Sequence, residues 1–126
     1  MHVGFVGTGN MGAAMAANIL KSGHTITVYD RRPEATAELE RLGAARAADL
    51  PSLARAARVT LLSLPDESVV AAVVLGSPGA PGLLAGAQRG DVIFDLSTVS
   101  AESTRRLAAR AVAGGVRLID APVSGS

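Results

Sequence analysis

The stretch VGFVGTGNMGAAMAANIL, residues 3–20, decides the fold. Its first part is a short apolar run, residues 3–6, which ends at Gly7 and predicts a buried strand. An Ala- and Met-rich segment with helical spacing, residues 11–20, follows and stops at Ser22-Gly23. The stretch therefore predicts a strand that leads through a glycine-rich turn directly into a helix.

The glycines of this turn, Gly7, Gly9 and Gly12, have the spacing GxGxxG. Gly7 makes the tight turn out of the strand, Gly9 lets a pyrophosphate approach the backbone, and Gly12 lets the helix pack closely on the sheet. The helix N-terminus offers free N–H groups and the positive end of its dipole to the diphosphate. A strand before the turn and a helix after it favour a dinucleotide site over an ordinary glycine turn.

The second strand ends in a group that can bind a ribose. Residues 25–29 are β-branched and aromatic and predict this strand. Asp30 follows, about 20 residues beyond the glycines, where a carboxylate accepts hydrogen bonds from the adenosine ribose hydroxyls. Such a carboxylate would repel a 2′-phosphate, which favours NAD. Either Arg31 or Arg32 could pair with that phosphate and favour NADP. Of the two cofactors, NAD is slightly favoured.

The rest of the chain continues the alternation of strands and helices. Further strands are expected over 59–64, 92–96 and 116–119, and further helices over 34–42, 51–57, 67–75 and 101–113. Residues 76–90 are rich in Gly and Pro and predict a loop with a short turn at Leu83-Leu84. The predicted fold is a single α/β domain over residues 1–126, doubly wound, with a mostly parallel sheet of about six strands, which is the Rossmann arrangement.

Composition excludes several classes of function. The formal net charge is +1 and aromatic residues make up 2% of the chain, which argues against a nucleic-acid partner. The absence of cysteine excludes disulfides, thiolate metal sites and a cysteine nucleophile. The two histidines are far apart, so no metal site is predicted. No signal peptide and no apolar run of membrane-spanning length are present, and we expect no membrane partner and a cytoplasmic location.

Three short stretches lie at or just past the carboxyl ends of predicted strands, where open α/β sheets bind ligands. They are Leu64-Pro65-Asp66, Ser97-Thr98 and Ser124-Gly125-Ser126. For Asp66 and for Ser100, helix capping is the favoured interpretation. For Thr98 and Ser124, ligand binding and an ordinary turn role stay equally open.

Five stretches carry a resemblance to a known family, in order over the whole chain. They are residues 3–18, 30–34 (DRRPE), 64–66 (LPD), 94–98 (FDLST) and 120–125 (DAPVSG). The chain resembles the β-hydroxyacid dehydrogenases, the group of 3-hydroxyisobutyrate dehydrogenase, tartronate semialdehyde reductase and 6-phosphogluconate dehydrogenase. Two markers are more specific than GxGxxG: Asn10-Met11-Gly12 followed by Met15 and Asn18, and the DAPVSG stretch.

The resemblance implies a role for each matching position. The glycine loop with Thr8, Asn10 and Met11 would hold the adenosine diphosphate, together with Asp30 and Arg31. Leu64 and Pro65 would line the cofactor cleft, and Thr98 would contact the nicotinamide half. Ser124, Gly125 and Ser126 match the loop that holds the substrate carboxylate. Thr8 stands where the family usually has Leu, and Ser126 where it usually has Gly; both are expected to be small changes at backbone-contact positions.

The resemblance also implies parts that this chain does not contain. The family's catalytic lysine lies downstream, and Lys21, the only lysine here, is not expected to replace it. The helical second domain, which closes the cleft and makes the dimer, is also missing. We expect the cofactor domain of a homo-oligomeric oxidoreductase that acts on a small β-hydroxy acid. The alternatives are the cofactor domain of an imine reductase-like enzyme and a non-catalytic NAD(P)-binding module.

Overall fold

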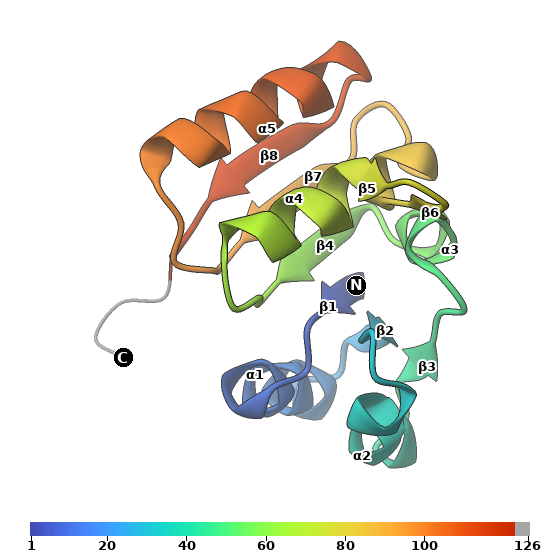
Figure 1. Ribbon diagram of the computed structural model, residues 1–126. Coiled ribbons are helices and arrows are strands. Elements are labelled where there is room, and N and C mark those ends of the chain that lie inside the picture. The colour runs from blue at the N-terminus through green and yellow to red at the C-terminus, as the bar shows by residue number, and fades with distance from the viewer. Residues whose placement is uncertain (123–126) are drawn as a thin grey trace.

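The computed structural model describes residues 1–122, apart from the side chain of Asn10. Within this range a six-stranded sheet has helices on both faces (Figure 1). Its strand order is β3-β2-β1-β4-β7-β8, and each neighbouring pair is parallel. The chain thus winds outward from β1 in both directions, which confirms the predicted doubly wound α/β fold.

The elements follow the alternation expected from the sequence. In chain order they are β1 (His2–Val6), α1 (Asn10–Lys21), β2 (Thr25–Tyr29), the 3₁₀ turn η1 (Pro33–Thr36), α2 (Ala37–Arg41), β3 (Ala45–Arg46), α3 (Leu50–Ala56), β4 (Val59–Leu62), α4 (Glu67–Leu75), β5 (Gly76–Ser77), β6 (Ala80–Pro81), the 3₁₀ turn η2 (Leu83–Ala85), β7 (Val92–Asp95), α5 (Ala101–Ala113) and β8 (Arg117–Asp120).

Apolar side chains on the two faces of the sheet form two buried clusters. One cluster contains Phe5 of β1 and Leu39 of α2, and it packs α1 and α2 onto the sheet. The other contains Leu62 of β4, Val70 of α4 and Leu107 of α5. Because successive side chains of a strand point to opposite faces, the inner strands are apolar on both sides.

Two predicted caps are confirmed. The carboxylate of Asp66 accepts a hydrogen bond from the backbone N–H of Val69 at 3.0 Å and begins α4. The hydroxyl of Ser100 accepts one from the N–H of Ser103 at 3.1 Å and begins α5. Each side chain supplies an acceptor for a helix N–H that has no partner within the helix.

Two segments differ from the sequence prediction. The helix expected over 34–42 begins as the 3₁₀ turn η1, in which the hydroxyl of Thr36 donates to the carbonyl of Pro33 at 3.0 Å. The loop expected over 76–90 holds the antiparallel pair β5 and β6, joined by Pro78-Gly79. Proline and glycine suit such a tight turn.

The edge strand β3 and the end of β4 also differ from the sequence prediction. The sixth strand is the two-residue β3, too short to show an alternating pattern. Strand β4 ends at Leu62 and does not reach residue 64, since the N–H of Leu64 leaves the sheet and donates to the hydroxyl of Ser97 at 2.9 Å.

Candidate functional site

The glycine turn lies between the end of β1 and the start of α1. Gly7 has a φ of +92°, and its N–H donates to the carbonyl of Tyr29 at 3.1 Å. A Cβ on Gly7 would collide with the backbone oxygen of Ser63, and a Cβ on Gly12 would collide with the backbone oxygen of Gly7. Both glycines are therefore needed for the close approach of β1, β4 and α1.

Gly9 differs from the other two glycines. It is exposed, has ordinary extended backbone angles, and a Cβ built on it would meet nothing within 4 Å. The fold therefore does not need a glycine at this position. What the missing side chain leaves is open space directly over the backbone at the start of α1.

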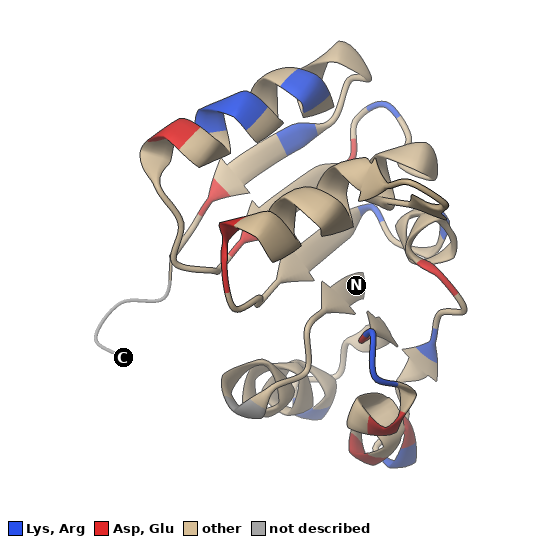
Figure 2. Cartoon of the chain, viewed as in Figure 1, with Lys and Arg blue, Asp and Glu red and all other residues tan. Residues whose placement is uncertain are grey.

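The N-terminus of α1 carries no neutralising group. No side chain caps it, and its first turn contains no acidic residue. In contrast, α4 has Glu67 and α5 has Glu102 in the first turn, and the ribbon is red for acidic residues at the start of both helices in Figure 2. The positive end of the α1 dipole and its unpaired N–H groups therefore remain available to an anion.

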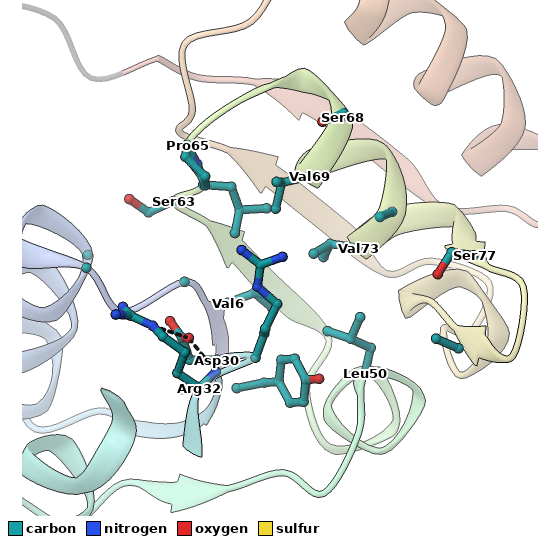
Figure 3. A pocket seen from close by; sticks show the side chains of 18 of the residues that line it. Val6, Asp30, Arg32, Leu50, Ser63, Pro65, Ser68, Val69, Val73 and Ser77 are labelled. Carbon is teal, nitrogen blue, oxygen red and sulfur yellow. Dashed lines mark hydrogen bonds and ion pairs between the residues drawn. The ribbon is translucent and has the colours of Figure 1, made fainter. Parts of the chain in front are cut away.

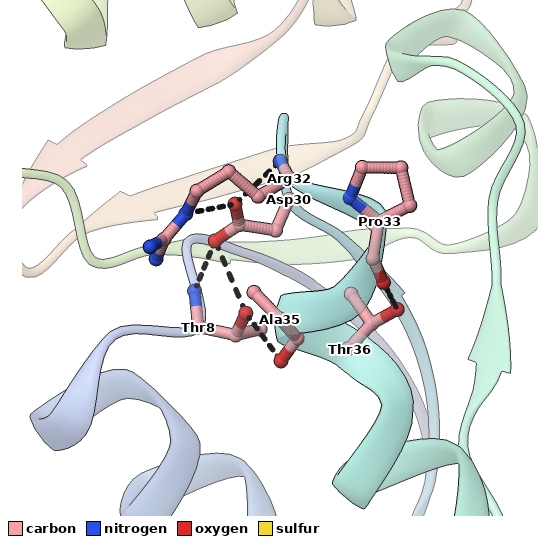
Figure 4. A network of polar contacts seen from close by, with 6 residues as sticks. All are labelled: Thr8, Asp30, Arg32, Pro33, Ala35 and Thr36. Atoms are coloured by element: carbon pink, nitrogen blue, oxygen red, sulfur yellow. Dashed lines mark hydrogen bonds and ion pairs between the residues drawn. The ribbon is translucent and has the colours of Figure 1, made fainter.

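Asp30 lies across the turn from Thr8 (Figure 4). Its Oδ2 accepts hydrogen bonds from the N–H of Thr8 at 2.9 Å and from the Thr8 hydroxyl at 3.1 Å. Its Oδ1 accepts one from the N–H of Arg32 at 2.9 Å, and the Arg32 Nε lies 3.7 Å away. The end of β2 and the glycine turn are thus joined through one carboxylate.

These contacts keep Asp30 ionised. Burial of the carboxyl group raises its pKa, but the backbone N–H groups of Arg32 and Thr8, the Thr8 hydroxyl and the Arg32 charge outweigh burial. The pKa of Asp30 therefore lies below its ordinary value. At neutral pH this edge of the site presents a fixed negative charge.

The glycine turn and Asp30 border one cleft of about 760 Å³ (Figure 3). Many of the site residues expected from the sequence line this cleft. They are Gly7, Gly9, Met11, Gly12, Asp30, Arg31, Arg32, Leu64 and Pro65. The volume lies within the range of small-molecule and cofactor sites.

Other expected residues lie elsewhere. Thr8 is buried and lies behind the cleft surface, and Thr98 is exposed in the β7–α5 loop and does not line the cleft. The backbone of Asn10 opens α1. Ser124, Gly125 and Ser126 lie outside the described residues.

Sequence reasoning missed the far wall of the cleft. Ser68, Val69, Ala72 and Val73 of α4 line it, and Figure 3 shows Val69 and Val73 facing the cleft. Ser77 and Ala80 of the β5–β6 hairpin, together with Leu50, complete this wall. The spacing of positions 69, 72 and 73 places them on one helix face and was a usable signal. The hairpin had no such signal.

A smaller hollow of about 290 Å³ adjoins the cleft at Asp30. Arg31 and Arg46 line it, together with Tyr29 and Pro33. Arg46 comes from β3 and was not a sequence candidate. The guanidinium groups of Arg31 and Arg46 place positive charge beside the Asp30 carboxylate, where a phosphate could bind them.

Two classes of feature are not seen among residues 1–122. No helix in this part of the chain combines the length and apolarity needed to cross a membrane. Within the same range, no group of three or more His, Asp or Glu side chains is placed to hold a metal ion.

The fold and the cleft define a Rossmann dinucleotide-binding domain. Residues 2–126 match the family described as the NAD binding domain of 6-phosphogluconate dehydrogenase, and the chain belongs to this family. It is 40% identical over 123 residues to 3-hydroxyisobutyrate dehydrogenase of Pseudomonas aeruginosa, a match that covers 98% of this chain and 40% of that protein. The predicted membership of the β-hydroxyacid dehydrogenase group is thereby confirmed.

Solved structures of related sequence share the fold of this chain. A structure described as Psf3 in complex with NADP+ and 2-OPP matches with a TM-score of 0.90 and 37% identity, over 98% of this chain and 43% of the other. An imine reductase from Bacillus cereus matches with a TM-score of 0.85 and 28% identity, over 99% and 41%. The chain spans about two-fifths of the length of these relatives.

Proposed function

We propose that this chain is the cofactor half of an enzyme that transfers a hydride between a nicotinamide dinucleotide and a small β-hydroxy acid or its semialdehyde. The observation that carries the proposal is the open space over Gly9 at the uncapped start of α1, in a cleft bordered by Asp30. A diphosphate needs this open backbone and a ribose needs this carboxylate, so the residues present fit the cofactor.

The proposal gives each part of the cleft a task. The N–H groups at the start of α1 bind the diphosphate, and Asp30 accepts a hydrogen bond from a ribose hydroxyl. Val69, Ala72 and Val73 of α4 supply an apolar wall suited to a flat heterocycle. Leu64 and Pro65 line the way toward the reactive end.

Other roles rest on the family resemblance alone. Thr98 would contact the nicotinamide half, and its exposure in the β7–α5 loop leaves it accessible for that contact. Ser124, Gly125 and Ser126 would hold the substrate carboxylate. The cofactor supplies the hydride acceptor or donor, and the protein supplies binding, orientation and exclusion of water.

For the cofactor, we favour NAD over NADP. The ionised Asp30 repels a 2′-phosphate, which supports NAD. Arg31 and Arg46 beside it support some acceptance of NADP, as does the NADP+ in the matched structure. Asp30 directly follows β2, where folds of this kind place the carboxylate that binds the ribose, so its effect should dominate.

By the family resemblance, proton transfer would belong to a lysine in a downstream helical segment, and a helical second domain would close the cleft. The sheet itself supports a further covering element. Ile93 and Leu118 belong to a core cluster, whereas the next residues, Phe94 and Ile119, point to the opposite face, stay half-buried and belong to neither cluster. A homo-oligomeric full-length enzyme and a cytoplasmic location stay predictions from the sequence.

An imine reductase is the second candidate, because such enzymes share the fold of this domain. The two are separated by assay of the full-length enzyme with β-hydroxy acids and with cyclic imines, followed by nicotinamide absorbance. Turnover of β-hydroxy acids supports the proposal. Reduction of imines alone, with no oxidation of any hydroxy acid, would assign the enzyme to the second class.

A further inference from the structure

Thr8 occupies the second position of the glycine turn, but its side chain does not face the cleft. The residue is 6% exposed. Its hydroxyl lies 3.1 Å from Asp30 Oδ2 and 3.1 Å from the carbonyl oxygen of Ala35 in η1 (Figure 4). Any influence of this side chain on a ligand must therefore pass through Asp30 or through the η1 turn.

The hydrogen bonds of Asp30 decide which oxygen a ligand can use. A carboxylate oxygen has two acceptor positions. The N–H of Thr8 donates to Oδ2, and the one proton of the Thr8 hydroxyl favours this charged oxygen over the Ala35 carbonyl oxygen at the same distance. Both acceptor positions on Oδ2 are then taken. Oδ1 accepts the N–H of Arg32, and the Arg32 Nε lies 3.7 Å from it, beyond hydrogen-bond distance. One acceptor position, on Oδ1, remains for a hydroxyl in the cleft.

We propose that Thr8 is a positioning residue for cofactor choice: its hydroxyl fixes the Asp30 carboxylate so that Oδ1 accepts a hydroxyl of an unphosphorylated ribose. This inference rests on the proposed function and adds a residue that acts from behind the cleft. The contact is worth more than an ordinary hydrogen bond because its acceptor is charged.

Without the Thr8 hydroxyl, the carboxylate would keep the two backbone N–H donors but lose the side-chain donor to Oδ2. It would then turn more freely, and its pKa would rise because that hydroxyl helps to lower the pKa of Asp30, while the group stays ionised at neutral pH. The freer carboxylate makes a weaker contact with a ribose hydroxyl, whereas its charge still repels a 2′-phosphate. Selection for NAD over NADP should fall.

The test is calorimetric titration of the chain with NAD and with NADP, for the wild type, Thr8→Val and Thr8→Ser. Valine keeps the shape and removes the hydroxyl, and serine keeps the hydroxyl. We expect Thr8→Val to weaken NAD binding about tenfold, the size of one hydrogen bond to a charged group. NADP binding should change less than about threefold on the same scale. Thr8→Ser should restore the wild-type preference.

Thr36→Val is the matched control. Thr36 is also buried. Its hydroxyl lies within hydrogen-bond distance of the Pro33 carbonyl oxygen and of the Glu40 carboxylate, and it does not contact Asp30. Its removal tests whether a loosened η1 alone changes cofactor choice, and we expect an unchanged ratio of the two affinities. Carbon-13 NMR titration of the Asp30 carboxyl gives a second readout: its pKa should rise in Thr8→Val and not in Thr8→Ser.

The outcomes separate the two proposals. If the wild type binds NAD and Thr8→Val leaves both the affinity ratio and the pKa of Asp30 unchanged, the inference is wrong and the proposed function stands. If the folded wild type binds neither dinucleotide, both are wrong. Should Thr8→Val fail to fold, Thr8→Ala, which adds no branched methyl, carries the same expected loss of ratio.

Discussion

The backbone N–H of Leu64 donates to the hydroxyl of Ser97, 2.9 Å away and 33 positions along the chain. The contact joins the segment after β4 to the segment after β7, and the N–H of Ser97 in turn donates to Asp95 at 3.0 Å. Leu64 and Pro65 therefore reach the cleft on a backbone that leaves the sheet at a fixed point. The carboxyl edge of the sheet is held by side chains as well as by strand pairing.

Replacing Ser97 with alanine should destabilise the domain. The N–H of Leu64 would lose its acceptor in a partly buried position, which costs about 1–3 kcal/mol of unfolding free energy. Urea unfolding followed by circular dichroism measures the change. Thr98→Ala, one residue on and exposed, is the control and should stay within about 0.5 kcal/mol. Equal losses in the two variants would show that the Leu64 contact is unimportant.

Asp95 should make stability depend on pH. Burial raises its pKa, and the nearby charge of Asp120 raises it further, against the hydrogen bonds from Ser97. The folded state therefore holds this proton more tightly than the unfolded state. Between the ordinary value of 3.8 and the raised pKa, stability falls as pH rises, and above that window the full cost remains.

Asp95→Asn removes this cost and keeps an oxygen that can accept from Ser97. We expect the variant to melt at a higher temperature than the wild type at pH 7, with the difference shrinking toward pH 3. Thermal melts across that range measure it. Asp120→Asn, on the exposed partner, should give a smaller shift in the same direction. A difference in melting temperature between Asp95→Asn and the wild type that stays the same from pH 3 to pH 7 would contradict the assignment.

The residues at the end of β2 should set cofactor choice in opposite ways. Asp30→Ala should weaken NAD more than NADP, since it removes a ribose acceptor and a charge that repels the 2′-phosphate. Arg31→Ala should weaken NADP more than NAD. Fluorescence titration with the reduced cofactors measures both. Equal losses of the two cofactors in both variants would mean that neither side chain reads the 2′ position.

Local patterns predicted much of the fold and part of the site. The GxGxxG turn and the strand that ends at Asp30 each carry a pattern of their own within a few residues, so each could be predicted locally. The caps Asp66 and Ser100 are local for the same reason, because a capping side chain contacts an N–H only a few residues ahead. These features lie in the structure where they were expected.

Contacts between distant segments could not be predicted in this way. Thr8 was expected to be a minor change at a backbone-contact position, yet its hydroxyl contacts Asp30 and Ala35, which lie 22 and 27 positions away. The α4 wall and the β5–β6 hairpin enter the cleft only through the packing of α4 on the sheet. The strand β3 is two residues long, so it has no period to detect.

The chain on its own should bind cofactor without turnover. His2 bonds to Thr25 and Thr27 where β1 and β2 begin, away from the cleft, and Lys21 ends α1. Proton transfer by a positioned group contributes roughly 10²–10⁴ in rate, and substrate positioning about 7–11 kcal/mol of the barrier. Assays of nicotinamide absorbance with β-hydroxy acids and semialdehydes should therefore show no reaction. Turnover abolished by a substitution at Asp120 or Ser124 would refute this expectation.

The central claim is that the uncapped start of α1, open over Gly9, binds a dinucleotide. Calorimetric titration of NAD into the wild-type chain and into Gly9→Val tests it most directly. Gly114→Ala serves as the control, because its added Cβ would lie an ordinary 3.7 Å from the Ala111 carbonyl oxygen, on another helix. The account predicts one NAD per wild-type chain, the same for Gly114→Ala, and near-complete loss in a Gly9→Val variant that keeps its fold. Unchanged NAD binding by folded Gly9→Val would contradict it.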